Sequence, residues 1–345
     1  MFIMNAWYVA ARSSEIKDRP LGRRICNQPM VLYRDSNSRV YALEDFCPHR
    51  GLPLSLGTVQ GDSLVCGYHG LVMGCNGLTQ SMPKQCVDRF PEITSYACEE
   101  RHNYIWIWPG EKALADPTKI PDYPWLNAQY WTHGGDVFHI KADYRLMIDN
   151  LMDLTHENYV HSASIGQKEI DEQPVRTRRD GDTVITERQI PNVIAPPFWQ
   201  AAMRQQYLDP NAEVDRWQVC RFVEPSNIHI DVGVALAGKG GINAPLEQKV
   251  RAVVSDFITP ETEKSHFYFW GMARSWALDD PEVTEKIKHG QRGIFSEDLE
   301  ILESQQRSLN ENAGRQLLML DIDAGGAQAR KLIKKRIEQE SGVQF

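Results

Sequence analysis

Two short stretches decide how the first part of this chain folds: DFCPHRG at residues 45–51 and LVCGYHG at residues 64–70. Each brings one thiol and one imidazole, and the four side chains are those of Cys47, His49, Cys66 and His69. Two cysteines and two histidines suit a zinc ion. They suit equally a [2Fe–2S] cluster in which two histidines replace two cysteines on one iron. We therefore expect two loops that converge on one metal centre.

The spacing of these ligands favours the iron–sulfur cluster. Zinc fingers usually keep cysteine with cysteine and histidine with histidine. Here each half-site is mixed, C-x-H in one loop and C-x-x-H in the other, so each loop can give one ligand to each iron. The flanking residues would let backbone amides approach the sulfur atoms; they are Pro48, Gly51, Gly67 and Gly70. A structural zinc ribbon and four unrelated core residues are the alternatives.

The composition is that of an ordinary globular protein and excludes several functions. The chain has 345 residues, more than the roughly 250–300 that one hydrophobic core usually serves, so we expect two domains. A formal net charge of −8 argues against nucleic acid and anionic membranes as partners. No apolar run approaches the ~18 residues of a membrane span, and the opening MFIMNAWYVAAR does not resemble a secretory signal. We therefore expect a cytoplasmic protein.

The hydrophobic pattern predicts an α+β chain in two parts. Short runs of β-branched and aromatic residues predict early strands at residues 25–34, 40–45, 63–67 and 104–108. A Pro-rich stretch follows, and we expect the boundary there, giving domains 1–115 and 116–345. Later strands are predicted at residues 183–189, 217–224, 229–235, 250–259 and 265–270. Helices are predicted at residues 144–161, 280–306 and 328–340, the last opened by Gly325 and Gly326.

A second cluster of polar residues lies in DNLMDLTHENYVH, at residues 149–161. On an ideal helix Asp153 and His156 share a face because they are three residues apart. His156 and His161 are five apart, about 140° around the same helix, which is wide for two ligands of one metal. A π-bulge or a break after His156 would bring the imidazoles together. Two histidines and a carboxylate form the facial triad of non-haem Fe(II) oxygenases; a solvated helix with two incidental histidines is the alternative.

Together the two constellations resemble the oxygenase components of the Rieske non-haem iron oxygenase family. The shared motifs are C-P-H-R-G and C-x-Y-H-G, followed by N-L-M-D-x-x-H-x-x-x-x-H. Several segments are similar to the aromatic-acid O-demethylase branch, among them NAWYVA at residues 5–10, FWGMAR at 269–274 and LDIDAGG at 320–326. The resemblance implies an N-terminal all-β Rieske [2Fe–2S] domain. It also implies a C-terminal catalytic domain of antiparallel sheet and helices, of the helix-grip (START-like) type.

The resemblance implies a role for each candidate ligand. The cluster ligands would be Cys47 and Cys66 on one iron and His49 and His69 on the other. A separate catalytic iron would be bound by His156, His161 and a carboxylate from a late helix. Asp298 occupies the matching position in FSEDLEILESQQ, and Glu297 is its nearest rival.

Two further residues would support the catalytic iron. Asp153 matches a carboxylate that hydrogen-bonds a cluster histidine of the neighbouring subunit, expected to be His69, and that also touches His156. Asn150 would lie near the iron without binding it. Three apolar residues are possible walls of a substrate pocket, although ordinary core positions are favoured for all of them: Met147, Phe269 and Trp270.

The implied activity is that of a terminal oxygenase that removes a methyl group from an aromatic ether. The expected reaction uses O₂ to convert vanillate to protocatechuate and formaldehyde, with dicamba, methoxybenzoates or toluenesulfonate as alternative substrates. The chain has no G-x-G-x-x-G motif, so a separate reductase with a flavin and a ferredoxin-type centre must supply electrons. A homotrimer is expected, because the family passes electrons across a subunit boundary. A Rieske electron carrier and a zinc-stabilised binding protein are alternatives from other classes.

Overall fold

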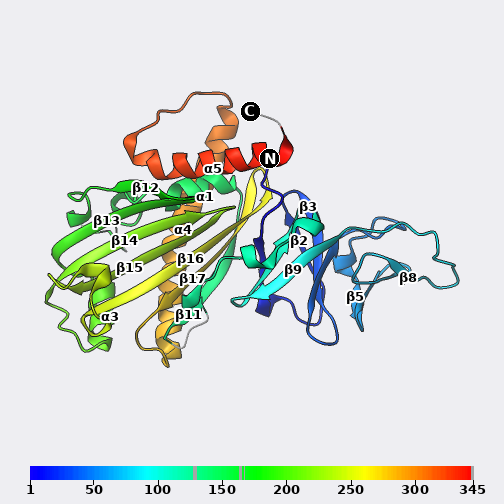
Figure 1. Ribbon diagram of the computed structural model, residues 1–345, viewed down its shortest axis with the longest axis horizontal. Coiled ribbons are helices and arrows are strands. Elements are labelled where there is room, and N and C mark those ends of the chain that lie inside the picture. Colours follow the sequence, from blue (N-terminus) through cyan, green and yellow to red (C-terminus); the bar gives the residue numbers. More distant parts are fainter. Residues whose placement is uncertain (127–129, 163–164, 167, 343–345) are drawn as a thin grey trace. The chain divides into compact units, whose positions relative to one another are not determined.

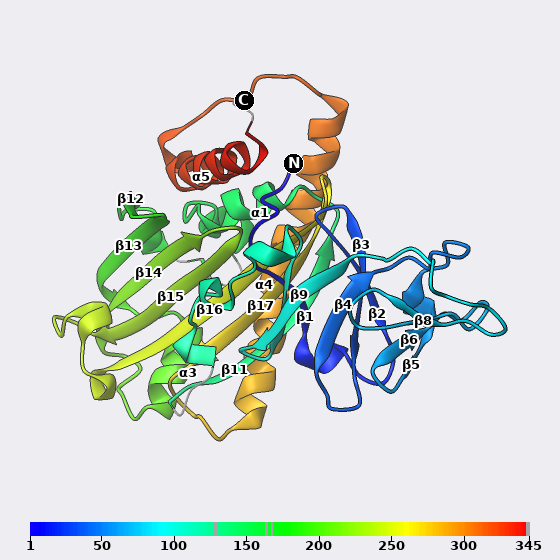
Figure 2. The same ribbon diagram turned by 45° about the vertical axis from the view of Figure 1, so that its right-hand side comes forward.

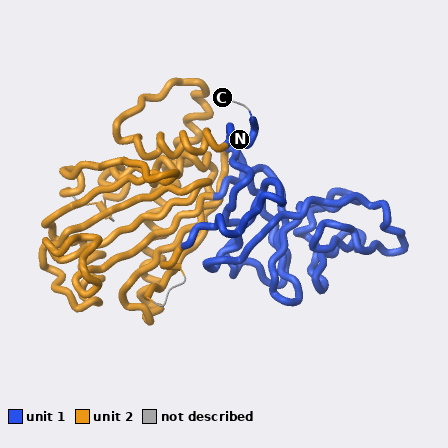
Figure 3. The backbone as a smooth tube through the Cα atoms, viewed as in Figure 1, with its two compact units in different colours: residues 1–122, 259–263, 337–345 blue, residues 123–258, 264–336 orange. Residues whose placement is uncertain are grey.

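The computed structural model describes residues 1–126, 130–162, 165–166 and 168–342. The chain forms two compact units, which Figure 3 colours separately. The first comprises residues 1–122, 259–263 and 337–345, and the second comprises residues 123–258 and 264–336. Each unit therefore contains segments that are far apart in the sequence.

The first unit contains a six-stranded antiparallel sheet in the order β1-β10-β9-β4-β3-β2. Figure 2 labels β1, β2, β3, β4 and β9 of this sheet. Its strands are β1 Tyr8–Arg12, β2 Leu21–Ile25, β3 Gln28–Arg34, β4 Val40–Glu44, β9 Ser95–Arg101 and β10 Tyr104–Trp108. All five side chains of β10, YIWIW, are buried, which explains why an apolar run without alternation forms a strand here.

The single strand expected at residues 25–34 is in fact a hairpin. Ile25 pairs with Gln28, and the two residues between them, Cys26 and Asn27, have φ values of +49° and +68°. Positive φ at both central residues is the geometry of a primed hairpin turn, whose twist matches that of the flanking strands. The turn was missed because it contains no glycine.

A smaller four-stranded sheet, in the order β5-β6-β7-β8, completes the first unit. Its strands are β5 Thr58–Gln60, β6 Ser63–Val65, β7 Val72–Met73 and β8 Thr79–Ser81. The loop between β6 and β7 carries Cys66 and His69. A buried core packs around Cys47 and Cys66 and includes Leu54, Leu64, Leu71 and Met73.

The second unit is built on a seven-stranded antiparallel sheet in the order β11-β17-β16-β15-β14-β13-β12 (Figure 1). Its strands are β11 Thr132–Ile140, β12 Arg176–Asp180, β13 Thr183–Ile194, β14 Glu213–Val223, β15 Asn227–Leu236, β16 Lys249–Thr262 and β17 Ser265–Arg274. The α+β class is therefore confirmed. Four of the five later strands expected from the sequence lie within β13, β15, β16 and β17, and the fifth, residues 217–224, extends one residue beyond β14; the observed strands are longer.

Five α-helices accompany the described strands: α1 Tyr144–Leu151, α2 Glu157–Val160, α3 Pro197–Gln205, α4 Pro281–Glu311 and α5 Ala324–Ser341. The start of α4 is capped by Asp280, whose carboxylate accepts from the amides of Glu282 and Val283. Phe295 of α4 packs edge-to-face on Tyr268 and Trp270 of β17, so α4 lies across one face of the sheet (Figure 2). No helix in the described ranges has both the length and the apolar character of a membrane-spanning helix.

The prediction of one continuous helix over residues 144–161 is wrong. The chain forms α1, an irregular segment at residues 152–156, and then α2, so the break precedes His156 rather than following it. Asp153 explains the break: its Oδ1 accepts from both the amide and the hydroxyl of Thr155, each at 2.7 Å. Such local bonds from an aspartate compete with helical hydrogen bonding.

The last helix begins four residues earlier than expected, so its two glycines lie inside its first turn. A Cβ on Gly325 would lie 2.6 Å from the carbonyl oxygen of Met152. A Cβ on Gly326 would lie 2.6 Å from the Asp149 carboxylate. The glycines therefore permit a close approach between α5 and the end of α1, which contains the candidate residue Asn150.

Candidate active site

The two cysteine–histidine loops of the first unit share one backbone geometry. In each, the cysteine amide donates to the carbonyl of the leucine that closes the loop, at 2.9 Å from Cys47 and 2.8 Å from Cys66. In each, a glycine amide donates back to the cysteine carbonyl, at 2.8 Å from Gly51 and 3.0 Å from Gly70. These glycines have φ values of +71° and +73°, which residues with a Cβ rarely adopt. The repeated loop presents the four candidate ligands as two equivalent pairs.

The four side chains have the thiols inside and the imidazoles outside. Cys47 and Cys66 are each 2% exposed, and burial raises the pKa of the Cys47 thiol. His49 and His69 are exposed, and their ring centroids lie 4.5 Å apart. Two buried sulfurs and two outward imidazoles fit a [2Fe–2S] group whose two irons carry different ligands.

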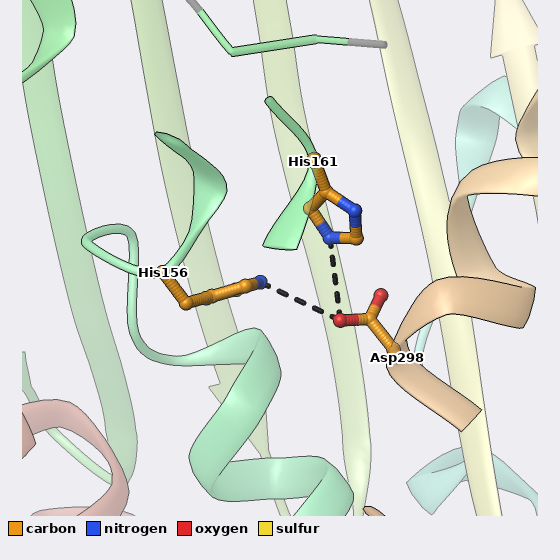
Figure 4. A group of neighbouring side chains, drawn as sticks. All are labelled: His156, His161 and Asp298. Atoms are coloured by element: carbon orange, nitrogen blue, oxygen red, sulfur yellow. Dashed lines mark ion pairs between the residues drawn. The ribbon is translucent and has the colours of Figure 1, made fainter. Parts of the chain in front are cut away.

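The second constellation closes around one point, as Figure 4 shows. One nitrogen each of His156 and His161 and one carboxylate oxygen of Asp298 all lie within 4.8 Å of one another. Asp298 Oδ1 is 3.6 Å from His156 Nε2 and 3.2 Å from His161 Nε2. Two imidazoles and one carboxylate can hold a single metal ion and leave other coordination positions open, as in the facial triad.

Each member of this trio is held by a further hydrogen bond. His161 Nδ1 lies 2.6 Å from Glu297 Oε2, and Asn150 Nδ2 donates to Asp298 Oδ1 at 2.9 Å. Burial alone lowers the pKa of His161, but the hydrogen bonds and charges of Asp298 and Glu297 outweigh it and raise that pKa. Glu297 and Asp298 thus contact opposite nitrogens of the His161 ring, Nδ1 and Nε2.

Asp153 contacts His156 mainly through its main chain. The Asp153 carbonyl oxygen lies 2.8 Å from His156 Nδ1, whereas the nearest carboxylate oxygen, Oδ2, is 3.9 Å away. The other carboxylate oxygen is bound by Thr155. Oδ2 thus remains the oxygen with which Asp153 can accept a bond from elsewhere. Asn150 differs in that its Oδ1 is buried with no hydrogen-bond partner among the described residues.

A cavity of about 460 Å³ opens beside the trio. That volume lies within the roughly 300–1,000 Å³ of small-molecule sites. Its lining is largely apolar and includes Phe198 and Trp199 of α3, Ile230 and Val232 of β15, and Met272 of β17. Three residues considered as possible walls are not among the lining residues and are buried core, as favoured: Met147, Phe269 and Trp270.

A buried polar cluster adjoins the cavity. Glu157 Oε1 accepts from Gln218 Nε2 at 2.5 Å, and Glu157 Oε2 lies 3.4 Å from Arg188 Nη2. Arg188 also donates twice to Gln218 Oε1, at 2.6 and 3.0 Å. Glu157, Gln218 and Arg216 all line the cavity. Burial lowers the pKa of Arg216; the Glu157 charge opposes this effect, and the Arg188 charge adds to it.

Sequence reasoning missed this cluster. Arg216 and Gln218 lie two residues apart on β14 and so point to the same face, and both are buried. Polar residues at alternating positions of a core strand would have been the signal. The expected strand began at Trp217, however, and left Arg216 outside.

Comparison with known proteins identifies the same two parts. The Rieske [2Fe-2S] domain family matches residues 6–92, and the vanillate O-demethylase oxygenase C-terminal domain family matches residues 140–339. The vanillate O-demethylase oxygenase subunit of Pseudomonas sp. strain HR199 is 58% identical over 99% of this chain and 96% of its own. The oxygenase component of dicamba O-demethylase from Stenotrophomonas maltophilia is 34% identical over 99% of both chains.

A solved structure supports the same family assignment. Dicamba monooxygenase bound to 3,6-dichlorosalicylic acid superposes with a TM-score of 0.91 at 32% identity, over 99% of both chains. The Rieske domain, the His/His/Asp trio and this similarity along the whole chain are mutually consistent. The chain belongs to the vanillate O-demethylase oxygenase family of Rieske non-haem iron monooxygenases.

Proposed function

We propose that this protein is the terminal oxygenase of an O-demethylase that converts vanillate and O₂ to protocatechuate and formaldehyde. The observation that carries the proposal is the trio of His156, His161 and Asp298 at the wall of a largely apolar cavity. Two relatives named as vanillate O-demethylase oxygenase subunits, 58% and 57% identical to this chain, support vanillate as the substrate.

The cofactor assignments follow the two constellations. Cys47 and Cys66 would bind one iron of the [2Fe–2S] cluster, and His49 and His69 the other. His156, His161 and Asp298 would bind Fe(II), which when bound supplies the chemistry that activates O₂. The chain's own contribution is to hold these ligands, exclude water and aim the methoxy carbon of the substrate. Hydroxylation of that carbon gives a hemiacetal, which collapses to the phenol and formaldehyde.

The protein requires an electron donor, as the oxygenase subunit of a multi-component system. We propose a reductase with a flavin and a ferredoxin-type centre, and a homotrimer in which Asp153 links His156 to His69 of the neighbouring subunit. Its Oδ2, which accepts no hydrogen bond from the residues that the structure describes and lies 3.9 Å from His156 Nδ1, supports this role. We further propose that residues 1–115 form the Rieske domain and residues 116–345 the catalytic domain, and that the protein works in the cytoplasm.

The test is formaldehyde release from the methoxy compounds and formation of the benzylic alcohol from toluenesulfonate, whose methyl group is bonded to carbon and yields no formaldehyde. Purified protein, a reductase of this class and NADH are mixed with vanillate, dicamba, 3-methoxybenzoate or toluenesulfonate under air. We expect one formaldehyde and one protocatechuate per vanillate consumed, with vanillate the preferred substrate. Turnover of only another compound in the set would move the protein to that sister activity.

Two measurements separate this proposal from the other classes of function. A Rieske cluster makes the protein red-brown, whereas a zinc-stabilised binding protein is colourless. An oxygenase contains a mononuclear iron beyond those of its cluster, whereas a simple electron carrier does not. Colour and iron content of the purified protein therefore decide between the three before any substrate is added.

A further inference from the structure

The cavity beside the metal-binding trio has a buried cation on its wall. Histidines aside, the cationic residues among its described lining are Arg216 and Lys286. Arg216 is 4% exposed and belongs to the central sheet. Lys286 lies on α4 with its side chain 78% exposed, next to Glu282. A hydrated surface lysine interacts weakly with an anion, so a buried guanidinium is the stronger recognition element.

We propose that Arg216 binds the carboxylate of the aromatic substrate and thereby restricts this oxygenase to aromatic acids. The inference rests on the proposed O-demethylase function and identifies the residue that sets its substrate class. A planar guanidinium matches a carboxylate as a two-pronged donor. The iron ligands come from helix α4 and the segment around α2, whereas Arg216 comes from β14. A bound acid can therefore be held at the sheet and present its methoxy group to the ligands.

The surroundings of Arg216 strengthen this role. Its neighbours across the sheet are Ile190 on β13 and Val234 on β15, both buried and apolar. A charge in such surroundings interacts more strongly than one in water. The carboxylate needs a partner there for the same reason, because an unpaired buried charge is costly.

The polar cluster beside Arg216 holds its other charges in pairs. Glu157 is bound by Gln218 and lies beside Arg188, on which the charges of Asp153 and Asp171 also act. Arg216 lines the cavity, so a carboxylate in the cavity can pair with its guanidinium. A neutral ligand of the same shape gains no such pairing.

The experiment uses the holoenzyme with its reductase and three variants. Arg216→Met removes the charge. Arg216→Lys keeps the charge but cannot donate two parallel hydrogen bonds to a carboxylate. Lys286→Met removes the exposed lysine for comparison. Each is assayed by formaldehyde release with vanillate and with guaiacol, which lacks the carboxylate. Equilibrium dialysis of both compounds measures binding independently of turnover. Cluster absorbance and melting temperature check that the variants are folded.

We expect Arg216→Met to lower kcat/KM for vanillate by about 100-fold or more, mainly through KM, because a buried charged partner is lost. Its selectivity for vanillate over guaiacol should fall by a similar factor. Arg216→Lys should be intermediate, because an ammonium cannot bind a carboxylate with two prongs. Lys286→Met tests the other cation of the cavity and should change the selectivity for vanillate over guaiacol by less than about twofold, because an exposed charge interacts weakly with an anion.

Three results would overturn the inference. One is an equal loss with vanillate and guaiacol in Arg216→Met, which indicates a purely structural role. Another is a loss of selectivity in Lys286→Met instead. The third is unchanged dialysis constants for vanillate in both Arg216 variants. Failure of the O-demethylase function is different, because wild-type protein would then release no formaldehyde from vanillate. Dialysis would still report whether Arg216 recognises the carboxylate.

Discussion

Glu297 accepts a hydrogen bond from His161, with its Oε2 2.6 Å from Nδ1 of the ring. A carboxylate can only accept, so Nδ1 carries a proton, and Nε2, 3.2 Å from Asp298 Oδ1, is the nitrogen on the side of a metal ion. Adjacent residues of α4 thus contact the two nitrogens of one imidazole. A carboxylate behind a metal-binding histidine fixes its tautomer and orientation.

Glu297→Ala should weaken binding of the mononuclear iron by roughly 10–100-fold, the usual effect of losing such a supporting carboxylate. The [2Fe–2S] cluster should be unaffected. Iron content is measured after dialysis against a graded series of chelator concentrations, with cluster absorbance as the internal reference. Glu300→Ala, on an exposed position of the same helix, is the control and should retain iron like wild type. Equal iron retention in both variants would contradict the supporting role.

Asp298→Ala should remove the mononuclear iron while the red-brown cluster remains. The substitution deletes the carboxylate oxygen that lies 3.6 Å from His156 Nε2 and 3.2 Å from His161 Nε2. It also leaves the Asn150 amide without the acceptor that it has in this structure. Metal analysis and absorbance of the same sample check both halves of the expectation, and formaldehyde release should vanish. A variant that keeps its full iron content would show that Asp298 is not a ligand.

The sequence predicted which candidate ligands come together because their motifs are local. It predicted their environment poorly because that environment depends on residues far apart in the sequence. Cys47, His49, Cys66 and His69 lie in two short loops whose glycines enforce the turn. The break before His156 depends on how Asp153 bonds Thr155, which a helical wheel does not represent. The sequence alone could not separate Glu297 from Asp298, because adjacent residues on a helix differ only in the direction of their side chains. In the structure Glu297 contacts Nδ1 of His161, and Asp298 lies beside Nε2 of both histidines.

The cavity depends on contacts between distant strands, and this explains the remaining misses. Arg216 and Gln218 join a polar cluster only because β14 pairs with β13, which brings Arg188 opposite Gln218. Glu157, from α2, then completes the cluster. None of these residues belongs to a motif. Conversely, apolar residues such as Trp270 pack against Phe295 in the core instead of facing the cavity.

Asp256 should make stability depend on pH. It is fully buried, and burial raises its pKa to about 7, opposed by the hydrogen bond from the Tyr268 hydroxyl (2.6 Å) and reinforced by the Asp298 charge. An unfolded aspartate has a pKa near ~3.9. Between about pH 4 and about pH 7 the folded protein therefore holds a proton that the unfolded chain has lost, and stability falls as pH rises through that window.

Asp256→Asn cannot ionise and can still accept from Tyr268. Its melting temperature relative to wild type should therefore be higher at pH 7.5 than at pH 5.5. The comparison is made by thermal unfolding of both proteins in matched buffers, so that the titration of all other groups is common to both. A difference between the proteins that is the same at the two pH values would show that Asp256 does not carry a raised pKa.

Asp153→Asn should leave both metal centres loaded and nearly abolish turnover. The amide can still accept from Thr155 through its oxygen, so the loop that positions His156 is kept. The other oxygen, Oδ2, is replaced by a donor, and a donor cannot accept the bond from a neighbouring cluster imidazole that we propose. Thr155→Val is the matched control: it loses one bond to Oδ1 but keeps the carboxylate, and should lose far less activity.

The step that fails can be measured directly. Protein with a reduced cluster is mixed with vanillate and O₂, and reoxidation of the cluster is followed by its absorbance in a single turnover. In wild type, reoxidation should accompany formaldehyde release. In Asp153→Asn it should be slowed by about 10–100-fold, the size of effect seen when a group that orients a metal ligand is lost. Wild-type reoxidation in this variant would place the electron route elsewhere, whereas fast reoxidation without formaldehyde would assign Asp153 to product formation instead.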